Sequence, residues 1–292
     1  MHKTTAVRLN RFTCCENRHA FRTGAFPVTY YGNTLHACDE AAGSENPTPE
    51  AKMRLLTYNI HKGIGGRDRR YDLERIVRVI EDQKADLICL QEVTSNARRT
   101  EHDDQPKLLA SYLKAHASDF QMNVHYRRGG YGNLVLSRWP IHTADQISLR
   151  RSWWKPRGAQ ILVVDTPEGK LHLANSHLGL RERERHWQID RLLQHDAFQK
   201  SAHLPSLVVG DFNDWRDTLA SGPFARHRFD HATNPTKKFR SFPAFMSLLS
   251  LDKAFHRGPI SIRDAWIDRS WLARRASDHL PLTIDFRLTA KH

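Results

Sequence analysis

Cysteine is scarce in this sequence and long apolar runs are absent, which excludes two classes of protein. The 292 residues contain four cysteines, of which Cys14 and Cys15 are adjacent and Cys89 lies in an apolar stretch. This spacing does not fit a disulfide framework, so we expect reduced thiols and a cytoplasmic protein. No apolar run approaches about 18 residues, so the sequence predicts no membrane-spanning helix, and the N-terminus lacks the apolar core of a secretory signal.

Acidic residues are few relative to basic ones. Lys and Arg total 45 against 32 Asp and Glu, which gives a net charge of +13. Residues 1–50 contain five of each sign, so the whole excess belongs to residues 51–292. An excess of this size favours polyanionic partners, namely nucleic acid, an anionic membrane surface or phosphorylated small molecules. Charge that serves solubility alone is the alternative.

The first fifty residues differ in pattern from the rest of the chain. They show no sustained periodicity and end in "AAGSENPTPE", a linker-like composition, whereas a strand-like pattern begins at Met53. We expect residues 1–50 to be an N-terminal extension and residues 51–292 to be one folded domain. Two alternatives stay open for the extension: a disordered segment, or a stretch upstream of a natural translation start at Met53.

Helical and strand patterns alternate from residue 53 onward. The pattern predicts helices over 71–83, 105–120 and 181–202, and strands over 53–60, 86–92, 132–141, 206–211 and the C-terminal third. "AQILVVD" and "KLHLANS" are separated by "TPEG", which predicts a hairpin. Since several strands follow one another directly, a strictly parallel sheet does not fit. We expect an α/β protein with mixed sheets flanked by helices.

Polar residues stand where several of the predicted strands end. "SLVVGDFNDW" is the clearest case, because an apolar strand gives way to a glycine and several polar residues. One such end is explained by a turn, since Asp and Asn bond their own backbone. Five ends that carry Glu, Asp, Asn and His predict a shared cleft instead. The residues concerned are Asn59, Glu92, Asn175, His177, Asp211, Asn213, Asp278 and His279.

These residue types suit metal-assisted attack of water on a phosphoester. Glu92 and Asp278 offer hard carboxylate oxygens, which suit Mg²⁺ or, in its place, Mn²⁺, and Asn59 could add a neutral oxygen. Each also has a structural alternative. Glu92 could be a helix N-terminal charge, Asn59 an Asx turn, and Asp278 a cap or turn residue before Pro281.

The remaining polar residues suit the chemistry around the scissile bond. Asp211 could take a proton from the attacking water or orient it, with Asn213 positioning it. His177 and His279 could hydrogen-bond phosphate oxygens as charge builds up. Asp252 in "LSLDKAF" could hold His279 in one tautomer. For a single histidine such as His177, a hydrogen-bonded core position is the structural alternative.

Seven segments together resemble a known family. The order of these segments is similar to that of the endonuclease/exonuclease/phosphatase superfamily, which includes DNase I-like nucleases, abasic-site endonucleases, neutral sphingomyelinases and inositol polyphosphate 5-phosphatases. The resemblance spans roughly residues 53–288. The segments are "TYNIHKG", "DLICLQEV", "GNLVLSRWPI", "NSHLG", "GDFND", "LDKAF" and "SDHLP".

The resemblance implies a fold and a set of roles. The implied fold is a four-layer α/β sandwich, with two mixed sheets face to face and helices outside. Its implied metal ligands are Asn59, Glu92 and Asp278. The implied catalytic residues are the phosphate-contacting His177, the water-orienting Asp211 and Asn213, and His279 with its partner Asp252. Whether His279 acts as a base or only as an electrostatic stabiliser is left open.

The substrate is not fixed by these motifs. The 5-phosphatase signatures are missing, since "GDFND" and "LSLDKAF" stand where the Asn-Tyr/Phe-Arg ending and the "PAWCDR" segment are expected. "RRSWWKPR" combines basic residues with Trp153 and Trp154, which could follow a phosphate backbone and stack on a base, or rest on an anionic membrane. Many members of the family carry a basic segment where this sequence has Arg157. The resemblance therefore implies that Arg157 contacts substrate phosphate; a solvated charge is the alternative.

We therefore expect a Mg²⁺-dependent nuclease-like phosphodiesterase that acts on DNA or another nucleic acid. Phospholipid or small phosphate esters are the alternative substrates. A nucleic-acid-binding module without catalysis is the second alternative, against which the apparently complete ligand set argues. The sequence predicts no oligomeric state.

Overall fold

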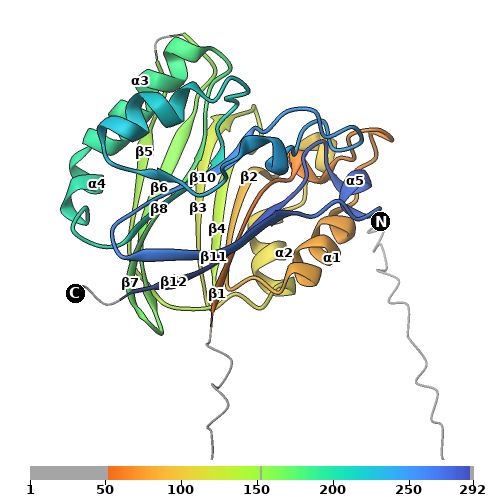
Figure 1. The fold of residues 1–292 in the computed structure, drawn as a ribbon. Helices are drawn as coiled ribbons and strands as arrows, with labels where there is room; N and C mark the ends of the chain where they lie inside the picture. Colours follow the sequence, from red (N-terminus) through yellow and green to blue (C-terminus); the bar gives the residue numbers. More distant parts are fainter. Residues whose placement is uncertain (1–51, 152, 290–292) are drawn as a thin grey trace, which may run out of the picture. The chain divides into compact units, whose positions relative to one another are not determined.

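Residues 52–151 and 153–289 are described by the computed structural model, which forms two mixed six-stranded β-sheets with helices outside them (Figure 1). The sheets pack face to face, so the layers are helices, sheet, sheet and helices, which confirms the predicted α/β sandwich. The prediction for residues 1–50 lies outside the described residues.

Each sheet has a parallel pair of strands at its centre. β1 pairs parallel with β2, and β7 pairs parallel with β8, whereas every other pairing is antiparallel. The first sheet has the order β11 (Ile260–Ile267), β12 (Leu282–Leu288), β1 (Met53–Asn59), β2 (Leu87–Ser95), β4 (Gly130–Ser137) and β3 (Ala117–His125). The second has the order β5 (Ile141–Ser148), β6 (Gly158–Thr166), β7 (Gly169–His177), β8 (Ser206–Asp211), β10 (Asp252–Arg257) and β9 (Asp230–His231).

The helices cover the outer faces of the two sheets (Figure 1). The first sheet is covered by α1 (Leu73–Gln83), α2 (Gln105–Tyr112) and α5 (Ala273–Ala276), and the second by α3 (Glu182–Gln194) and α4 (Asp196–Lys200). Short 3₁₀ turns occupy His61–Gly63, Arg98–Thr100 and Thr236–Phe239, and a π-type turn occupies Ala220–Phe224. None of the helices described is both long and apolar enough to cross a membrane.

Two predicted helices are shorter than the sequence indicated. The helix predicted over 105–120 ends at Tyr112, because Lys114 adopts a left-handed conformation (φ 50°), and the chain continues as the edge strand β3. The helix predicted over 181–202 breaks at His195, whose extended backbone ends α3. The His195 side chain then accepts a hydrogen bond from the Ala197 amide and caps α4.

A small polar network is buried between the two sheets. Asn175 on β7 accepts a hydrogen bond from Gln91 of β2 (2.8 Å) and donates to Gln160 of β6 (3.0 Å). Gln91 also donates to Thr57 of β1 (3.1 Å). All four side chains are buried, so the strand-end asparagine of "NSHLG" serves the join between the sheets. Satisfied networks of this kind fix the alignment of the elements that they connect.

We expect Asn175→Leu to lower the free energy of unfolding by about 2–4 kcal/mol, because the Gln91 and Gln160 amides would lose buried partners. Urea unfolding measures this change. Gln194→Ala, which alters an exposed amide on α3, is the control and should change stability by less than about 0.5 kcal/mol. A loss below about 1 kcal/mol for Asn175→Leu would contradict the role given to the network.

The buried His172 makes stability depend on pH. Burial, together with the charge of Arg257, lowers its pKa to about 4, while the unfolded chain titrates near its ordinary value of 6.5. The unfolded state therefore binds the proton more readily, so stability is lost as the pH falls from about 6.5 toward 4. Between pH 7 and 5 the wild type should lose about 2 kcal/mol more than His172→Gln. Urea unfolding at the two pH values measures the difference, and equal losses would exclude this assignment.

Candidate active site

The two central parallel pairs bring their carboxyl ends to the same end of the sandwich. Asn59 ends β1 and Asp211 ends β8, and the Asn59 amide Nδ2 donates to Asp211 Oδ2 across the sheet interface (3.0 Å). Both side chains are buried. Three of the other residues predicted to share a cleft, His177, Asn213 and His279, contact or approach Asp211 around this hydrogen bond. Asn175 does not, because its side chain belongs to the network between the sheets.

The "GDFND" motif contains both a site and a turn. The backbone amide of Asn213 donates to Asp211 Oδ1 (3.0 Å), and the Asn213 side chain donates to the Leu178 carbonyl (3.0 Å). Asp214 instead accepts from the backbone amide of Leu219 (3.0 Å), as a capping residue does. The turn interpretation therefore holds for Asp214 and in part for Asp211, since the bond from the Asn213 amide is an Asx turn, but Asp211 also bonds Asn59 across the two sheets.

Gly210 allows the two parallel strands to meet directly behind Asp211. Its φ of +142° lies in a region that favours glycine, and a Cβ there would lie 1.9 Å from the Ser176 carbonyl oxygen. A side chain at this position would push β8 away from β7 and move Asp211.

His279 lies between two buried carboxylates. Its Nδ1 is 2.8 Å from Asp252 Oδ2, and its Nε2 is 3.7 Å from Asp211 Oδ2. The Ser241 hydroxyl donates a short hydrogen bond to the same Asp252 oxygen. Asp252 and Ser241 thus fix the imidazole with Nε2 turned toward Asp211, as expected for the Asp252–His279 pair.

Burial and neighbouring charges shift the ionisation of this cluster. Burial alone would lower the pKa of His279, but the charges of Asp252 and Asp211 outweigh it and raise that pKa to about 10. Burial raises the pKa of Asp211 to about 6, against the opposing effect of His279. An imidazolium is therefore the favoured form of His279.

His177 completes the group on the other side of Asp211. Its Nε2 is 3.4 Å from Asp211 Oδ2. Burial lowers the pKa of His177 well below its ordinary value, and the positive charges of Arg157, His279 and Lys155 lower it further. His177 is thus a neutral imidazole beside a charged one.

Glu92 is presented to the site by a β-bulge. The pairing of β2 with β4 shifts between Leu90 and Val93, and Glu92 has a φ of +57°. Such bulges turn a side chain away from the regular strand direction. The Glu92 carboxylate is ion-paired with the Lys62 ammonium. Burial raises the pKa of Glu92, but the Lys62 charge and hydrogen bond outweigh it, so that pKa is lowered.

Asp278 lies beside the end of β1. The Ser277 hydroxyl donates to the Asn59 carbonyl (2.8 Å), and the Asp278 carboxylate is 3.8 Å from the His61 Nδ1. The Asp278 side chain keeps 30% of its surface exposed and that of Glu92 keeps 12%, so both carboxylates can be reached from solvent. Hard carboxylates that water can reach could hold a divalent ion that retains water ligands. The Asn59 amide oxygen, the third predicted ligand, accepts a hydrogen bond from the His61 amide (3.0 Å).

Asp211, Asp252 and His279 also form a cluster of ligand atoms within 4.8 Å of one another. Their atoms already bond one another, however, since His279 uses Nδ1 for Asp252 and Asp211 is occupied by Asn59 and Asn213. A metal there would have to displace these hydrogen bonds, although Asp252 Oδ1 is buried without a hydrogen-bond partner among the described residues. The carboxylates of Glu92 and Asp278, which are partly exposed, could hold a metal without disturbing this cluster.

Two residues beside the site were not singled out from the sequence. Lys62 pairs with Glu92, and Ser241 supports Asp252. Lys155, which belongs to the predicted basic stretch "RRSWWKPR", is close enough to Glu92 and Asp211 for their charges to act on its pKa, which burial nevertheless lowers. Lys62 stands inside the "TYNIHKG" segment, so its position next to the site was a signal, whereas nothing in the sequence links Ser241 to Asp252.

The three predicted substrate-contacting residues differ in burial. Arg157 is buried and close enough to His177 to affect its pKa. Trp154 is half-buried, with the guanidinium groups of Arg151 and Arg181 over its ring at 5.4 and 5.2 Å. Trp153 is exposed in the connection between β5 and β6, outside the catalytic cluster.

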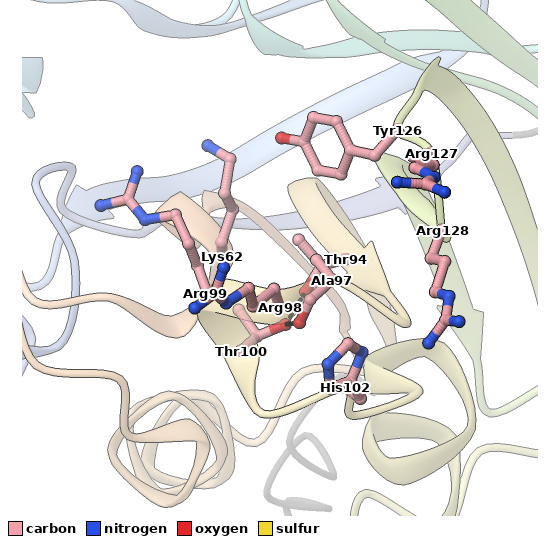
Figure 2. A pocket seen from close by; sticks show the side chains of 10 residues that line it. All are labelled: Lys62, Thr94, Ala97, Arg98, Arg99, Thr100, His102, Tyr126, Arg127 and Arg128. Carbon is pink, nitrogen blue, oxygen red and sulfur yellow. Dashed lines mark hydrogen bonds between the residues drawn. The ribbon is translucent and has the colours of Figure 1, made fainter.

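A basic cavity of about 550 Å³ lies next to Glu92 and its partner Lys62. Figure 2 shows Arg98 and Arg99 on one side of it and Arg127 and Arg128 on the other, with Lys62 and Tyr126 reaching over the space between them. Positive charge from two loops therefore converges beside the predicted metal ligands.

Comparison with known proteins places these observations in a family. The sequence profile of the Endonuclease/Exonuclease/phosphatase family matches residues 56–279. The uncharacterized protein YbhP of Escherichia coli K12 is 31% identical over 258 residues, covering 82% of this chain and 98% of that protein. The chain therefore belongs to the endonuclease/exonuclease/phosphatase family.

Solved structures share the fold at lower sequence identity. An endonuclease/exonuclease/phosphatase from Beutenbergia cavernae superposes with a TM-score of 0.68 at 22% identity, over 81% of this chain and 72% of that one. A mannosyl-6-phosphatase from Bacteroides thetaiotaomicron superposes with a TM-score of 0.63 at 16% identity, over 81% of this chain and all of that one. The chain is a phosphoester hydrolase of a family that generally depends on divalent metal ions.

Proposed function

We propose that this chain hydrolyses phosphodiester bonds with a bound Mg²⁺ ion, or Mn²⁺ in its place. The observation that carries the proposal is the convergence of Asn59, His177 and His279 on one oxygen, Asp211 Oδ2. Glu92, Asp278 and Asn59 would hold the ion. When bound, the ion would neutralise charge on the phosphate and on the leaving oxygen.

The protein side chains have distinct parts in the proposed reaction. Asp211 accepts a proton as water attacks phosphorus, and Asn213 keeps the Asp211 carboxylate in place. The bond from phosphorus to the leaving oxygen breaks, and the leaving oxygen takes a proton from solvent water, which yields a phosphomonoester and an alcohol. His279 and His177 donate hydrogen bonds to phosphate oxygens, where negative charge builds up in the transition state. Asp252 acts through His279 by holding its ring.

Nucleic acid is the substrate class supported by the net charge of +13 and the basic cavity beside Glu92. Arginines on both sides of the cavity could neutralise successive backbone phosphates, and Tyr126 offers a ring for base stacking. Phospholipid is the second candidate. It is supported by exposed aliphatic side chains near the site, such as Met246 and Leu248, which offer no stacking face to a base.

Asp211→Asn should lower kcat about 10³-fold, because it removes the proton acceptor while keeping the shape of the side chain. Hydrolysis with Mg²⁺ is measured on plasmid DNA, phosphatidylglycerol vesicles and bis(p-nitrophenyl) phosphate. Asp230→Asn, on the exposed edge strand β9, is the matched control and should keep the wild-type rate. If Asp211→Asn retained more than about a tenth of the activity, the assignment of the proton acceptor would be wrong.

Glu92→Gln should weaken Mg²⁺ binding by about tenfold or more, since a neutral amide replaces a hard carboxylate ligand. Isothermal titration calorimetry with MgCl₂ measures the dissociation constant. Glu81→Gln on the exposed side of α1 removes the same charge near the start of β2, at the other end of that strand from Glu92, and should leave the constant unchanged. Equal affinities for Glu92→Gln and the wild type would exclude Glu92 as a ligand.

A further inference from the structure

The large hydrophobic side chains that are exposed in this protein are concentrated at one end of the sandwich. Among the described residues ten such side chains are exposed, and nine of them lie in loops at the end that carries Asn59 and Asp211. Scattered exposed hydrophobic residues are ordinary on protein surfaces, whereas a concentration around a functional site marks an interaction surface.

Strand register places four of these loops. Tyr126 lies in the turn from β3 to β4, and β4 starts opposite the last residue of β2. Trp153 precedes β6, which starts opposite the end of β7. Leu180 follows the last residue of β7, and Trp215 follows Asn213 at the end of β8. All four side chains therefore surround the carboxyl ends of the central strands.

The largest group comes from the segment before β10. Phe245, Met246, Leu248 and Leu249 are all exposed there. This segment is attached to the site, since the Ala244 amide donates to the Asp278 carbonyl (2.7 Å) and the Phe242 ring contacts His279 at 4.9 Å between centroids. The apolar group thus lies directly beside a predicted metal ligand.

Basic side chains accompany the apolar ones. A cavity of about 450 Å³ is lined by Phe245, Trp271, Arg67, Asp68, Arg274 and Arg275. The Arg67 guanidinium lies over the Phe245 ring (5.8 Å) and that of Arg275 over the Trp271 ring (4.6 Å). Apolar residues that can enter a lipid layer, next to arginines that can contact phosphates, are typical of surfaces that bind anionic membranes.

We propose that the apolar rim, defined as Phe245, Met246, Leu248, Leu249 and Trp271, docks the active-site end of this protein onto an anionic phospholipid bilayer. Aromatic rings alone would also suit nucleic acid, because bases stack on them. Met246 and Leu248 favour a bilayer over nucleic acid. Transfer of an aliphatic side chain from water into lipid is favourable, whereas such a side chain offers no ring on which a base could stack. The inference rests on the proposed phosphodiesterase activity. Docking on a bilayer would bring phospholipid, the second candidate substrate, to the active site.

The test is co-sedimentation of the full chain with vesicles in EDTA, so that binding is measured without hydrolysis. The vesicles contain phosphatidylglycerol and phosphatidylethanolamine, or phosphatidylcholine alone as the uncharged comparison. The double variant Met246→Ser, Leu248→Ser should lower the partition coefficient for phosphatidylglycerol vesicles about tenfold or more. These side chains are 52% and 53% exposed, so serine should leave the thermal midpoint of unfolding unchanged.

Tyr112→Ser is the matched control. Tyr112 is 57% exposed at the end of α2, shortly before β3 begins opposite Ser137, the last residue of β4. It therefore lies at the end of the sandwich away from the site, and its loss should leave vesicle binding at the wild-type level. Hydrolysis of soluble bis(p-nitrophenyl) phosphate with Mg²⁺ should be the same for the double variant and the wild type.

Three results would overturn the docking proposal. The first is a wild-type chain that does not sediment with phosphatidylglycerol vesicles, or a double variant that sediments as the wild type does. The second is a double variant that loses affinity for a single-stranded oligonucleotide while keeping vesicle binding. The third is a wild-type dimer that the double variant dissociates, because a second copy would then cover the rim. Loss of hydrolysis of the soluble ester by Asp211→Asn tests the phosphodiesterase separately.

Discussion

The hydrogen bond between Asn59 and Asp211 joins the two halves of the sandwich at the point where chemistry is expected. One side chain ends a strand of the first sheet and the other ends a strand of the second, so neither sheet holds a complete site. Everything else in the site is placed relative to this contact. His279 and His177 approach the same Asp211 oxygen, and the buried Asn175 network sets how the sheets align behind it. Packing between the sheets is therefore a condition for catalytic geometry.

The opposite charges at this junction attract one another and so offset part of the free-energy cost of their burial. Asp211, Asp252 and His279 are all buried, and each isolated charge would be costly there. The pairing of His279 with Asp252, and the Ser241 hydroxyl on the same carboxylate, compensate part of that cost. The Lys62 ammonium compensates the charge of the Glu92 carboxylate in the same way. The ammonium keeps the Glu92 carboxylate ionised. A metal ion that bound to Glu92 would replace the ammonium as the compensating positive charge.

The residues at the junction of the two sheets, namely those around the Asn59–Asp211 hydrogen bond, were easier to predict from the sequence than their surroundings. Asn59 and Asp211 could be found because each ends a strand, and Glu92 because it follows the apolar run "LICLQ", whereas Asp278 stands just before a strand. The bulge that turns Glu92 toward Lys62 was not predictable, since it depends on pairing with β4. Likewise the alanine- and leucine-rich stretch after residue 105 favours a helix locally, and the left-handed Lys114 ends it.

Exposure of the rim was beyond sequence reasoning for a different physical reason. "FPAFMSLLS" has the composition of a buried segment, and only the fold reveals that Phe245, Met246 and Leu248 point away from both cores. The loops that carry these residues are the same connections that hold the catalytic side chains, but the two sets are constrained differently. Catalytic side chains are fixed by strand ends and buried hydrogen bonds, whereas loop side chains can change without moving them. Reaction type is thus set by the junction, and the surface on which the reaction takes place is set by the rim.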